Sequence, residues 1–397
     1  MRAAAAELAR LQQLQQRRQR RVVEAHPGEE ASARVRVEGR ELVNFCSNDY
    51  LGLAHDKRLG AAMSTAAQLW GAGAGAAHLL TGHTREHHEL ELELAAFTRR
   101  ESALLFSTGY MANVGVIQAL CSRTDVVVQD RLNHASLLDG ARLSGARLQR
   151  YPHGDVSAAG ALLESAGKRA AGEHAALLAT DGVFSMDGDV APLAQLAVLA
   201  AQHRAWLLVD DAHGLGVMGA SGRGVLERAG LDEQQVPLLV GTLGKALGSF
   251  GAFVAGQRDL IELVMQRARS YIYTTALPPA VAAATREALR IVDRDSSPRE
   301  RVHALTQRFR RGASQLGLAL GDSPTPIQPL LLGDAARCLA ASQRLMDRGY
   351  WVAAIRSPTV PVGTERLRIN LSAAHEEHEV DGLLDALHDV LTSGVTA

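Results

Sequence analysis

One lysine of this sequence stands where an amine, rather than a positive charge, is the useful property. Among the 42 lysine and arginine residues, lysine occurs only at Lys57, Lys168 and Lys245. Lys57 and Lys168 have polar neighbours and are predicted to be solvated. Lys245 follows the apolar run 237–240 in a glycine-rich turn, and Schiff-base formation is chemistry that an amine does and a guanidinium does not. The alternative is a lysine whose stem packs on apolar surface while its amine reaches solvent.

A second polar group follows another apolar run. Residues 206–209 read as a buried strand, and Asp210, Asp211 and His213 come directly after it, at the edge where open α/β sheets bind ligands. A carboxylate that keeps a pyridine nitrogen protonated and a lysine that binds an aldehyde together make pyridoxal 5'-phosphate (PLP) an electron sink. Lys245 comes about one strand–helix–strand unit after Asp210. The pair therefore predicts a PLP site, with an Asp210 helix cap as the alternative.

These residues need a sheet to position them. From residue 104 onward, short apolar runs alternate with helical patterns, which predicts a mostly parallel sheet covered by helices. The expected strands are 104–106, 126–128, 177–179, 207–209, 238–240 and 252–255. Residues 107–110 end the first strand and open a helix near Met111, whose free backbone amides offer an anion site suited to a phosphate.

The two ends of the chain predict smaller segments. Leu8, Leu11 and Leu14 have helical spacing, so we expect a helix over 3–22 that lies on the body of the protein; the alternative is a solvated charge run. Its basic end would carry Arg17, Arg18, Arg20 and Arg21. A hairpin is expected around 38–39, and a long helical pattern after Pro278. A turn at 323–326 and strands at 327–332, 351–355 and 367–371 complete the expected C-terminal part.

The predicted domain organisation has three parts. They are an N-terminal helix and hairpin segment over 1–45, a large PLP-binding domain over 46–290, and a C-terminal α+β domain over 291–397.

Two motifs have competing interpretations. The glycine-rich stretch 71–77 is similar to a dinucleotide fingerprint, but a helical pattern precedes it where the fingerprint needs a strand. We interpret it as a flexible active-site loop. His83, His87 and His88 could bind a metal, but no third ligand of convincing spacing accompanies the i, i+4 pair, so core or surface histidines are favoured.

Composition limits the class of protein. The chain has 397 residues, 47% hydrophobic and 21% charged, and a net charge of −1, so no global field attracts nucleic acid or membrane. Cys46, Cys121 and Cys338 are widely spaced and indicate a reducing cytoplasm. No apolar run approaches the ~20 residues of a membrane span. The first 25 residues lack a signal-peptide core, and Glu7 and Glu24 argue against a transit peptide.

Several stretches match, in order, the motifs of one known family. They are residues 47–53, 130–136, 182–188, 210–214, 242–245, 359–361 and 366–368. On these motifs the chain resembles the α-oxoamine synthases, from about residue 40 to residue 385. The resemblance implies an α/β fold of the PLP-dependent aminotransferase type (fold type I), with a mostly parallel central sheet and a smaller C-terminal α+β domain.

The resemblance also implies roles for residues of the cofactor site. Lys245 would bind PLP through its amine and move protons at the substrate α-carbon. Asp210 would pair with the pyridine nitrogen, His213 would bond the ring hydroxyl, and His134 would stack on the ring. Residues implied around the phosphate are Gly109, Tyr110, Ser185, Thr242 and, from a neighbouring subunit, Thr275.

Further residues are implied for the substrates. Arg368 would clamp the amino-acid carboxylate, for which a bidentate fork is suited, and Asn48 and Thr359 would line the substrate space with His134. An N-terminal arginine would meet the far end of an acyl chain. Arg18 is our choice and Arg20 the alternative, because this segment aligns only loosely.

The implied activity is a PLP-dependent condensation with loss of carbon dioxide. The resemblance favours L-alanine and a pimeloyl thioester, on acyl carrier protein or coenzyme A, in biotin biosynthesis by a cytoplasmic homodimer. The nearest alternative is a sister synthase that uses glycine or another amino acid with a different acyl thioester. An alternative of another class is a non-catalytic ligand sensor, which the intact Asp210, His213 and Lys245 set disfavours.

Overall fold

The computed structural model describes residues 2–24, 32–167 and 176–392, so Lys168 lies outside the described residues. The described chain forms two compact units. Unit 1 comprises the described parts of Met1–Gly52, Met186–Gly188 and Glu300–Ala397, and unit 2 comprises those of Leu53–Ser185 and Asp189–Arg299. The three predicted domains remain a prediction.

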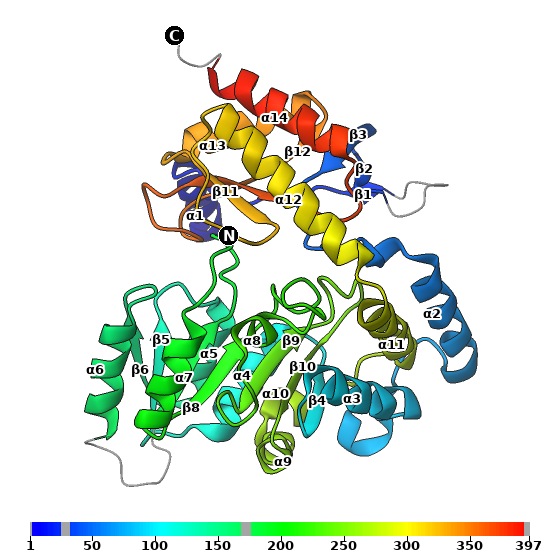
Figure 1. Ribbon diagram of the computed structural model, residues 1–397, viewed down its shortest axis with the longest axis vertical. Helices are drawn as coiled ribbons and strands as arrows, with labels where there is room; N and C mark the ends of the chain where they lie inside the picture. The colour runs from blue at the N-terminus through cyan, green and yellow to red at the C-terminus, as the bar shows by residue number, and fades with distance from the viewer. Residues whose placement is uncertain (1, 25–31, 168–175, 393–397) are drawn as a thin grey trace. The chain divides into compact units, whose positions relative to one another are not determined.

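Unit 2 is built on a seven-stranded sheet in the order β4-β10-β9-β8-β7-β5-β6 (Figure 1). Strand β10 runs antiparallel to both of its neighbours, and the other pairs are parallel. The strands are β4 Ser102–Phe106, β5 Val126–Asp130, β6 Arg147–Tyr151, β7 Ala176–Asp181, β8 Trp206–Asp210, β9 Leu238–Thr242 and β10 Ala252–Gly256. Their central residues are fully buried because helices cover the sheet.

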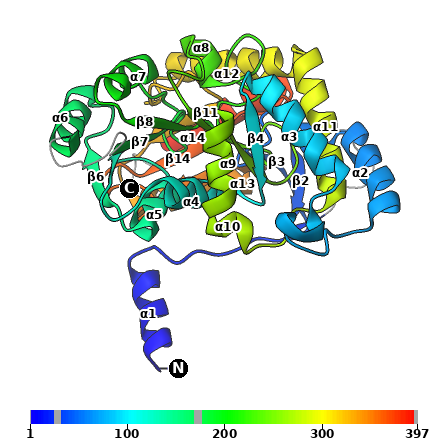
Figure 2. The ribbon, with the colours of Figure 1, turned by 90° about the horizontal axis from the view of Figure 1, so that it is seen from below.

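Helices α4, α5, α9 and α10 gather on one side of this sheet, as Figure 2 shows. The core between them and the strands contains Leu104, Ile117, Leu137, Val240 and Val254. The helices of the unit are η1 Leu53–His55, α2 Lys57–Trp70, η2 His78–Gly82, α3 Arg85–Thr98, α4 Gly109–Leu120, α5 Ala135–Ser144, α6 Val156–Gly167, α7 Leu193–Gln202, α8 Val225–Ala229, α9 Arg258–Arg267, α10 Arg269–Ile272 and α11 Pro279–Arg294.

Unit 1 contains two small sheets. The first has the order β1-β2-β3-β12 and the second the order β11-β14-β13. Their strands are β1 Val23–Glu24, β2 Arg34–Val37, β3 Arg40–Asn44, β11 Ile327–Leu331, β12 Tyr350–Trp351, β13 Ala353–Ile355 and β14 Arg366–Asn370. The helices are α1 Arg2–Gln13, α13 Ala335–Asp347 and α14 Glu377–Thr392, together with α12 Ser297–Gln315, which contains the boundary between the units.

Most of the predicted elements are confirmed. All six apolar runs of the large sheet are strands, and the hairpin turns at Glu38 and Gly39, both of which have positive φ. The sequence analysis missed β6, whose residues are largely polar. The long helical pattern after Pro278 is two helices, α11 and α12, with a break at Asp295.

The predicted helix over 3–22 is wrong in its second half. Helix α1 ends at Gln13, and Gln15 has a φ of 56°. The Leu11 carbonyl accepts the amides of both Gln16 and Arg17 at 2.8 and 3.1 Å, which closes the helix before the arginines. The basic residues therefore lie on extended chain, and Leu8 is 48% exposed.

Candidate active site

A cavity of about 210 Å³ collects most of the predicted cofactor residues within unit 2. Strands β7, β8 and β9 and helices α4 and α5 end or begin beside it, as expected for a ligand site at the carboxyl edge of parallel strands. Its polar lining is Gly109, Tyr110, Asn113, His134, Ser136, Asp181, Ser185, Asp210, His213, Thr242 and Lys245.

The Lys245 amine is held beside a histidine. Its Nζ lies 2.8 Å from Nε2 of His213, which lies three residues beyond β8. The turn that carries Lys245 is closed by a bond from the Gly248 amide to the Lys245 carbonyl. Gly248 has a φ of +60°, and a Cβ there would stand 2.4 Å from the Ala54 nitrogen. Only glycine therefore permits this turn, and the other described lysine, Lys57, is exposed.

Asp210 is fixed at the end of β8 by two donors. Its Oδ2 accepts a 2.6 Å hydrogen bond from the Asn113 amide, and its Oδ1 accepts the Ala212 backbone N–H at 3.0 Å. Asp210 is only 7% exposed. The neighbouring Asp211 points elsewhere, since it accepts the Val225 N–H at 2.8 Å. Of the two carboxylates in this run, Asp210 is thus the one that lines the cavity.

His134 caps helix α5 with its ring. Its Nδ1 lies 2.7 Å from the Ser136 hydroxyl and accepts the Ser136 backbone N–H at 3.3 Å, and its own amide donates to Asp181. Burial lowers the pKa of His134, and the nearby Lys245 lowers it further, against the opposing effect of Asp210. These effects favour a neutral imidazole, fixed at the cavity wall.

The cavity contains a set of donors suited to an anion. Thr108 caps helix α4 by accepting the Met111 amide at 3.1 Å, and the first amides of a helix have no partner within it. A Cβ on Gly109 would meet no atom within 4 Å, so this helix end faces open space. Ser185 and Thr242 add hydroxyls to the lining.

The loop that carries Ser185 is braced from β5. His153 lies 3.1 Å from an oxygen of Asp130 and 2.9 Å from an oxygen of Asp189, and its ring packs edge-on against Phe184. The hydrogen bonds to the two carboxylates raise the pKa of His153 to about 10. The residue is therefore a cation at neutral pH that joins both ends of the loop to the sheet.

Three lining residues were not predicted as site residues. Asn113 joins Asp210 to Ser136, donating to each at 2.6 and 2.9 Å. Asp181 ends β7 directly beside Asp210 in register, and desolvation raises its pKa well above the usual value. A polar side chain within the apolar helix α4 was the available signal for Asn113.

The predicted substrate residues lie in unit 1. Both terminal nitrogens of Arg368 donate to Oδ1 of Asn48 at 3.3 Å, and Arg368 is 6% exposed on β14. Arg18 donates to the hydroxyl of Thr359, also at 3.3 Å. The structure thus forms two pairs among these four residues.

Thr275 and the histidine motif have other surroundings. Thr275 is not part of the cavity lining, and its carbonyl accepts a 3.5 Å bond from Ser107. His87 is a buried structural residue, whose Nδ1 accepts the Thr84 amide and whose Nε2 donates to the Leu277 carbonyl at 2.7 Å. His83 packs against the His87 ring.

The chemistry of the cavity fits PLP. An amine, a carboxylate held as an acceptor at a strand end, a neutral ring and a helix N-terminus with two hydroxyls correspond to the aldehyde, pyridine nitrogen, ring face and phosphate of that group. Within the described residues, no helix is both long enough and apolar enough to cross a membrane.

Comparisons with known proteins agree with this geometry. The family model for class I and II aminotransferases matches residues 40–387. An 8-amino-7-oxononanoate synthase from Methylococcus capsulatus is 60% identical over 358 residues, which cover 90% of this chain and 91% of the relative. The chain therefore belongs to the class I and II aminotransferase family, in its 8-amino-7-oxononanoate synthase branch.

Solved structures support the same assignment. A serine palmitoyltransferase from S. paucimobilis, solved with bound PLP, has a TM-score of 0.89 at 30% identity, covering 98% of this chain and 97% of that one. An 8-amino-7-oxononanoate synthase from Francisella tularensis has a TM-score of 0.76 at 29% identity, covering 89% of this chain and 98% of that one. The predicted family resemblance and fold class are thereby confirmed.

Proposed function

We propose that this protein condenses L-alanine with a pimeloyl thioester, releases carbon dioxide and the free thiol, and forms 8-amino-7-oxononanoate in biotin biosynthesis. The observation that carries the proposal is the cavity that joins Lys245, His213, Asp210 and His134 in a chain 60% identical to a protein of that name. The cofactor is PLP, which supplies an electron sink for the electron pair left at the substrate α-carbon.

Residues of unit 2 would hold the cofactor. Lys245 would bind it covalently through Nζ, and Asp210 would face the pyridine nitrogen with its charge oriented by Asn113. His213, 2.8 Å from the amine, would bond the ring hydroxyl, and His134 would cover the ring face. Gly109, Tyr110, Ser185 and Thr242 would surround the phosphate, with Thr275 supplied by a second subunit.

The same lysine would move the proton. When alanine takes its place on the cofactor, the Lys245 amine is free to remove the α-proton and later to return one to the product carbon. The Arg368 guanidinium would bind the alanine carboxylate, in the position that Asn48 now helps to fix. Removal of the carboxylate as carbon dioxide follows bond formation to the acyl carbon.

The acyl donor requires a second cationic contact. A pimeloyl chain ends in a carboxylate or ester that Arg368 does not reach while it binds alanine. Arg18, bonded to Thr359 at 3.3 Å, would meet that end, with Arg20 as the alternative. Either acyl carrier protein or coenzyme A would deliver the thioester, and the protein would act as a cytoplasmic homodimer.

A product assay tests the proposal. The purified protein is incubated with PLP and either alanine plus pimeloyl thioester or glycine plus acetyl thioester, and products are identified by mass spectrometry. We expect 8-amino-7-oxononanoate and carbon dioxide from the first pair. Turnover of the second pair alone would assign a sister synthase, and no product from any pair would favour a sensor.

A further inference from the structure

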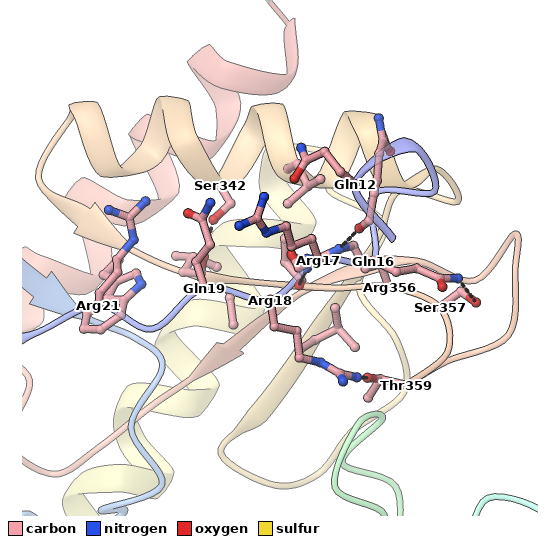
Figure 3. Close-up of a pocket in the computed structure, with 17 residues that line it drawn as sticks. Gln12, Gln16, Arg17, Arg18, Gln19, Arg21, Ser342, Arg356, Ser357 and Thr359 are labelled. Atoms are coloured by element: carbon pink, nitrogen blue, oxygen red, sulfur yellow. Dashed lines mark hydrogen bonds between the residues drawn. The ribbon is translucent and has the colours of Figure 1, made fainter. Parts of the chain in front are cut away.

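A second cavity, of about 640 Å³, lies wholly within unit 1 and outside the cofactor site (Figure 3). One wall is the segment that follows α1, residues 14–21, here called the N-terminal arm. The opposite wall is β13 and the residues after it. The arginines of the lining are Arg17, Arg18, Arg21 and Arg356, and no aspartate or glutamate lines it. The cavity is therefore suited to an anionic ligand.

Arg356 joins the two walls through backbone atoms. Its Nε donates to the carbonyl of Gln15, its Nη2 donates to the carbonyl of Arg17 at 3.0 Å, and its Nη1 donates to the carbonyl of Ala354 at 3.4 Å. Two of these acceptors belong to the arm and one to β13. One guanidinium thus attaches the arm to the sheet across more than 330 residues of sequence.

The other described hydrogen bonds between these walls are weaker. The Gln16 side chain donates to the Ser357 hydroxyl at 3.4 Å, and Arg18 donates to Thr359 at 3.3 Å. Both sites are long and at least partly exposed, whereas bonds from a charged donor are roughly twice as strong as neutral ones. Helix α1 gives little support, because Leu8 and Leu14 are about half exposed. The position of Arg18 therefore depends on the arm's attachment at Gln15 and Arg17.

We propose that Arg356 is a positioning residue that holds the N-terminal arm on β13 and thereby sets the affinity for the acyl donor. The guanidinium itself is occupied by three carbonyls, so it acts by placing Arg18 and Arg17 on the cavity wall. A lysine at this position would keep the charge but not the planar fork that reaches three acceptors together. The effect on the acyl donor rests on the proposed function; the attachment of the arm does not.

Two measurements on the PLP-loaded enzyme test this role in R356K, R356A and wild type. Hydrogen exchange reports the attachment of the arm, through peptides that cover residues 11–19. Steady-state kinetics report KM for alanine and for the pimeloyl thioester separately. We expect both variants to exchange faster in the arm and to raise the thioester KM roughly ten- to a hundredfold, the loss expected of a charged hydrogen bond, with alanine KM unchanged.

Two matched variants separate positioning from charge and from folding. R17Q removes a cavity charge but keeps the Arg17 carbonyl that Arg356 binds, so its arm should exchange as in wild type. R344K changes an arginine of α13 that donates to the Val390 carbonyl at 2.8 Å and does not line the cavity, so neither measurement should change.

The outcomes distinguish this proposal from the proposed function. Wild-type exchange in R356K and R356A would overturn the attachment. Faster exchange with an unchanged thioester KM would overturn the link to the donor, and a raised KM with unchanged exchange would make Arg356 a direct ligand instead. If wild-type enzyme turned over no pimeloyl thioester, the proposed function would fail, while exchange would still decide whether Arg356 holds the arm.

Discussion

At the scale of single residues, Asp210 shows how the cavity prepares its charge. Asn113 and the Ala212 amide each donate to one of its oxygens, so the carboxylate is oriented before any ligand binds. Buried acceptors of this kind keep their position because moving them would leave the donors unsatisfied. The charge of Asp210, rather than its size, is what the proposed chemistry uses.

The D210N variant tests this charge. We expect it to retain PLP but to lose α-proton exchange from alanine by roughly ten- to a hundredfold or more, the loss of a charged hydrogen bond at a minimum. Deuterium exchange followed by NMR measures the rate. D211N is the matched control, because Asp211 lies next in sequence and binds the Val225 amide instead. Exchange at the wild-type rate in D210N would require another partner for the pyridine nitrogen.

Arg18 is tested through the two substrates separately. R18A should raise the thioester KM by up to about 1.5–3 kcal/mol in free energy if the acyl chain ends in a carboxylate, and should leave alanine KM nearly unchanged. R20A is the comparison, since Arg20 does not line the 640 Å³ cavity. A larger loss in R20A would transfer the role to Arg20, and equal losses for both substrates would indicate a structural arm.

Sequence identified the residues whose type is itself unusual. A lone lysine after a strand and a carboxylate at a strand end were visible without coordinates. Asn113 was not, because its function depends on the register of α4 against β8, which brings its amide 2.6 Å from Asp210. Arg356 was hidden for the same reason: its acceptors are backbone carbonyls distant in sequence.

At the scale of elements, the bracing of the Ser185 loop by His153 predicts a pH-dependent stability. His153 has an ordinary pKa of 6.5, which the carboxylates of Asp130 and Asp189 raise to about 10. A group with a raised pKa stabilises the fold fully below its unfolded pKa, and this contribution is lost as pH rises towards the folded value. The stabilisation should thus be complete near pH 6 and absent above about pH 10.

H153Q measures that contribution. We expect a loss of roughly 1–3 kcal/mol in the free energy of unfolding near pH 6, after allowance for the 32% exposure of the side chain. Denaturant unfolding of both proteins from pH 6 to pH 10.5 should show the difference shrinking as pH rises. A difference that stayed constant would mean that the ring acts by packing on Phe184 alone.

Element prediction succeeded where burial was uniform. Strands β7 and β8 are buried on both faces and read as continuous apolar runs. Strand β6 is an edge strand with exposed polar residues, so its sequence carries no such run. The helix α1 was extended too far because leucine spacing continues to Leu14, whereas backbone closure at Leu11 ends the helix.

At the scale of the whole molecule, the segment around Tyr271 supports the proposed homodimer. Tyr271 is buried and stacks on His78, yet Tyr273 is 71% exposed, and Leu80 of η2 is 78% exposed. The backbone bond between Ala276 and Ala76 brings these two segments together. Exposed apolar side chains gathered in this way are typical of an interface.

Subunit complementation tests whether the interface completes the site. K245A and T275A are first shown to be inactive alone, and then mixed. We expect activity to return in the heterodimers, because one of the two sites keeps both Lys245 and the second subunit's Thr275. A monomer in analytical ultracentrifugation would contradict the homodimer, and a dimer without complementation would contradict the shared site.

The attachment of PLP to Lys245 is the central claim, and borohydride reduction tests it most directly. The holoenzyme is reduced, digested and mapped by mass spectrometry, with K245A as the control. Because the Lys245 amine lines the cavity and Lys57 is exposed, we predict a pyridoxyl label on Lys245 in wild type and none in K245A. A label on Lys57 or Lys168, or no label in wild type, would contradict the account.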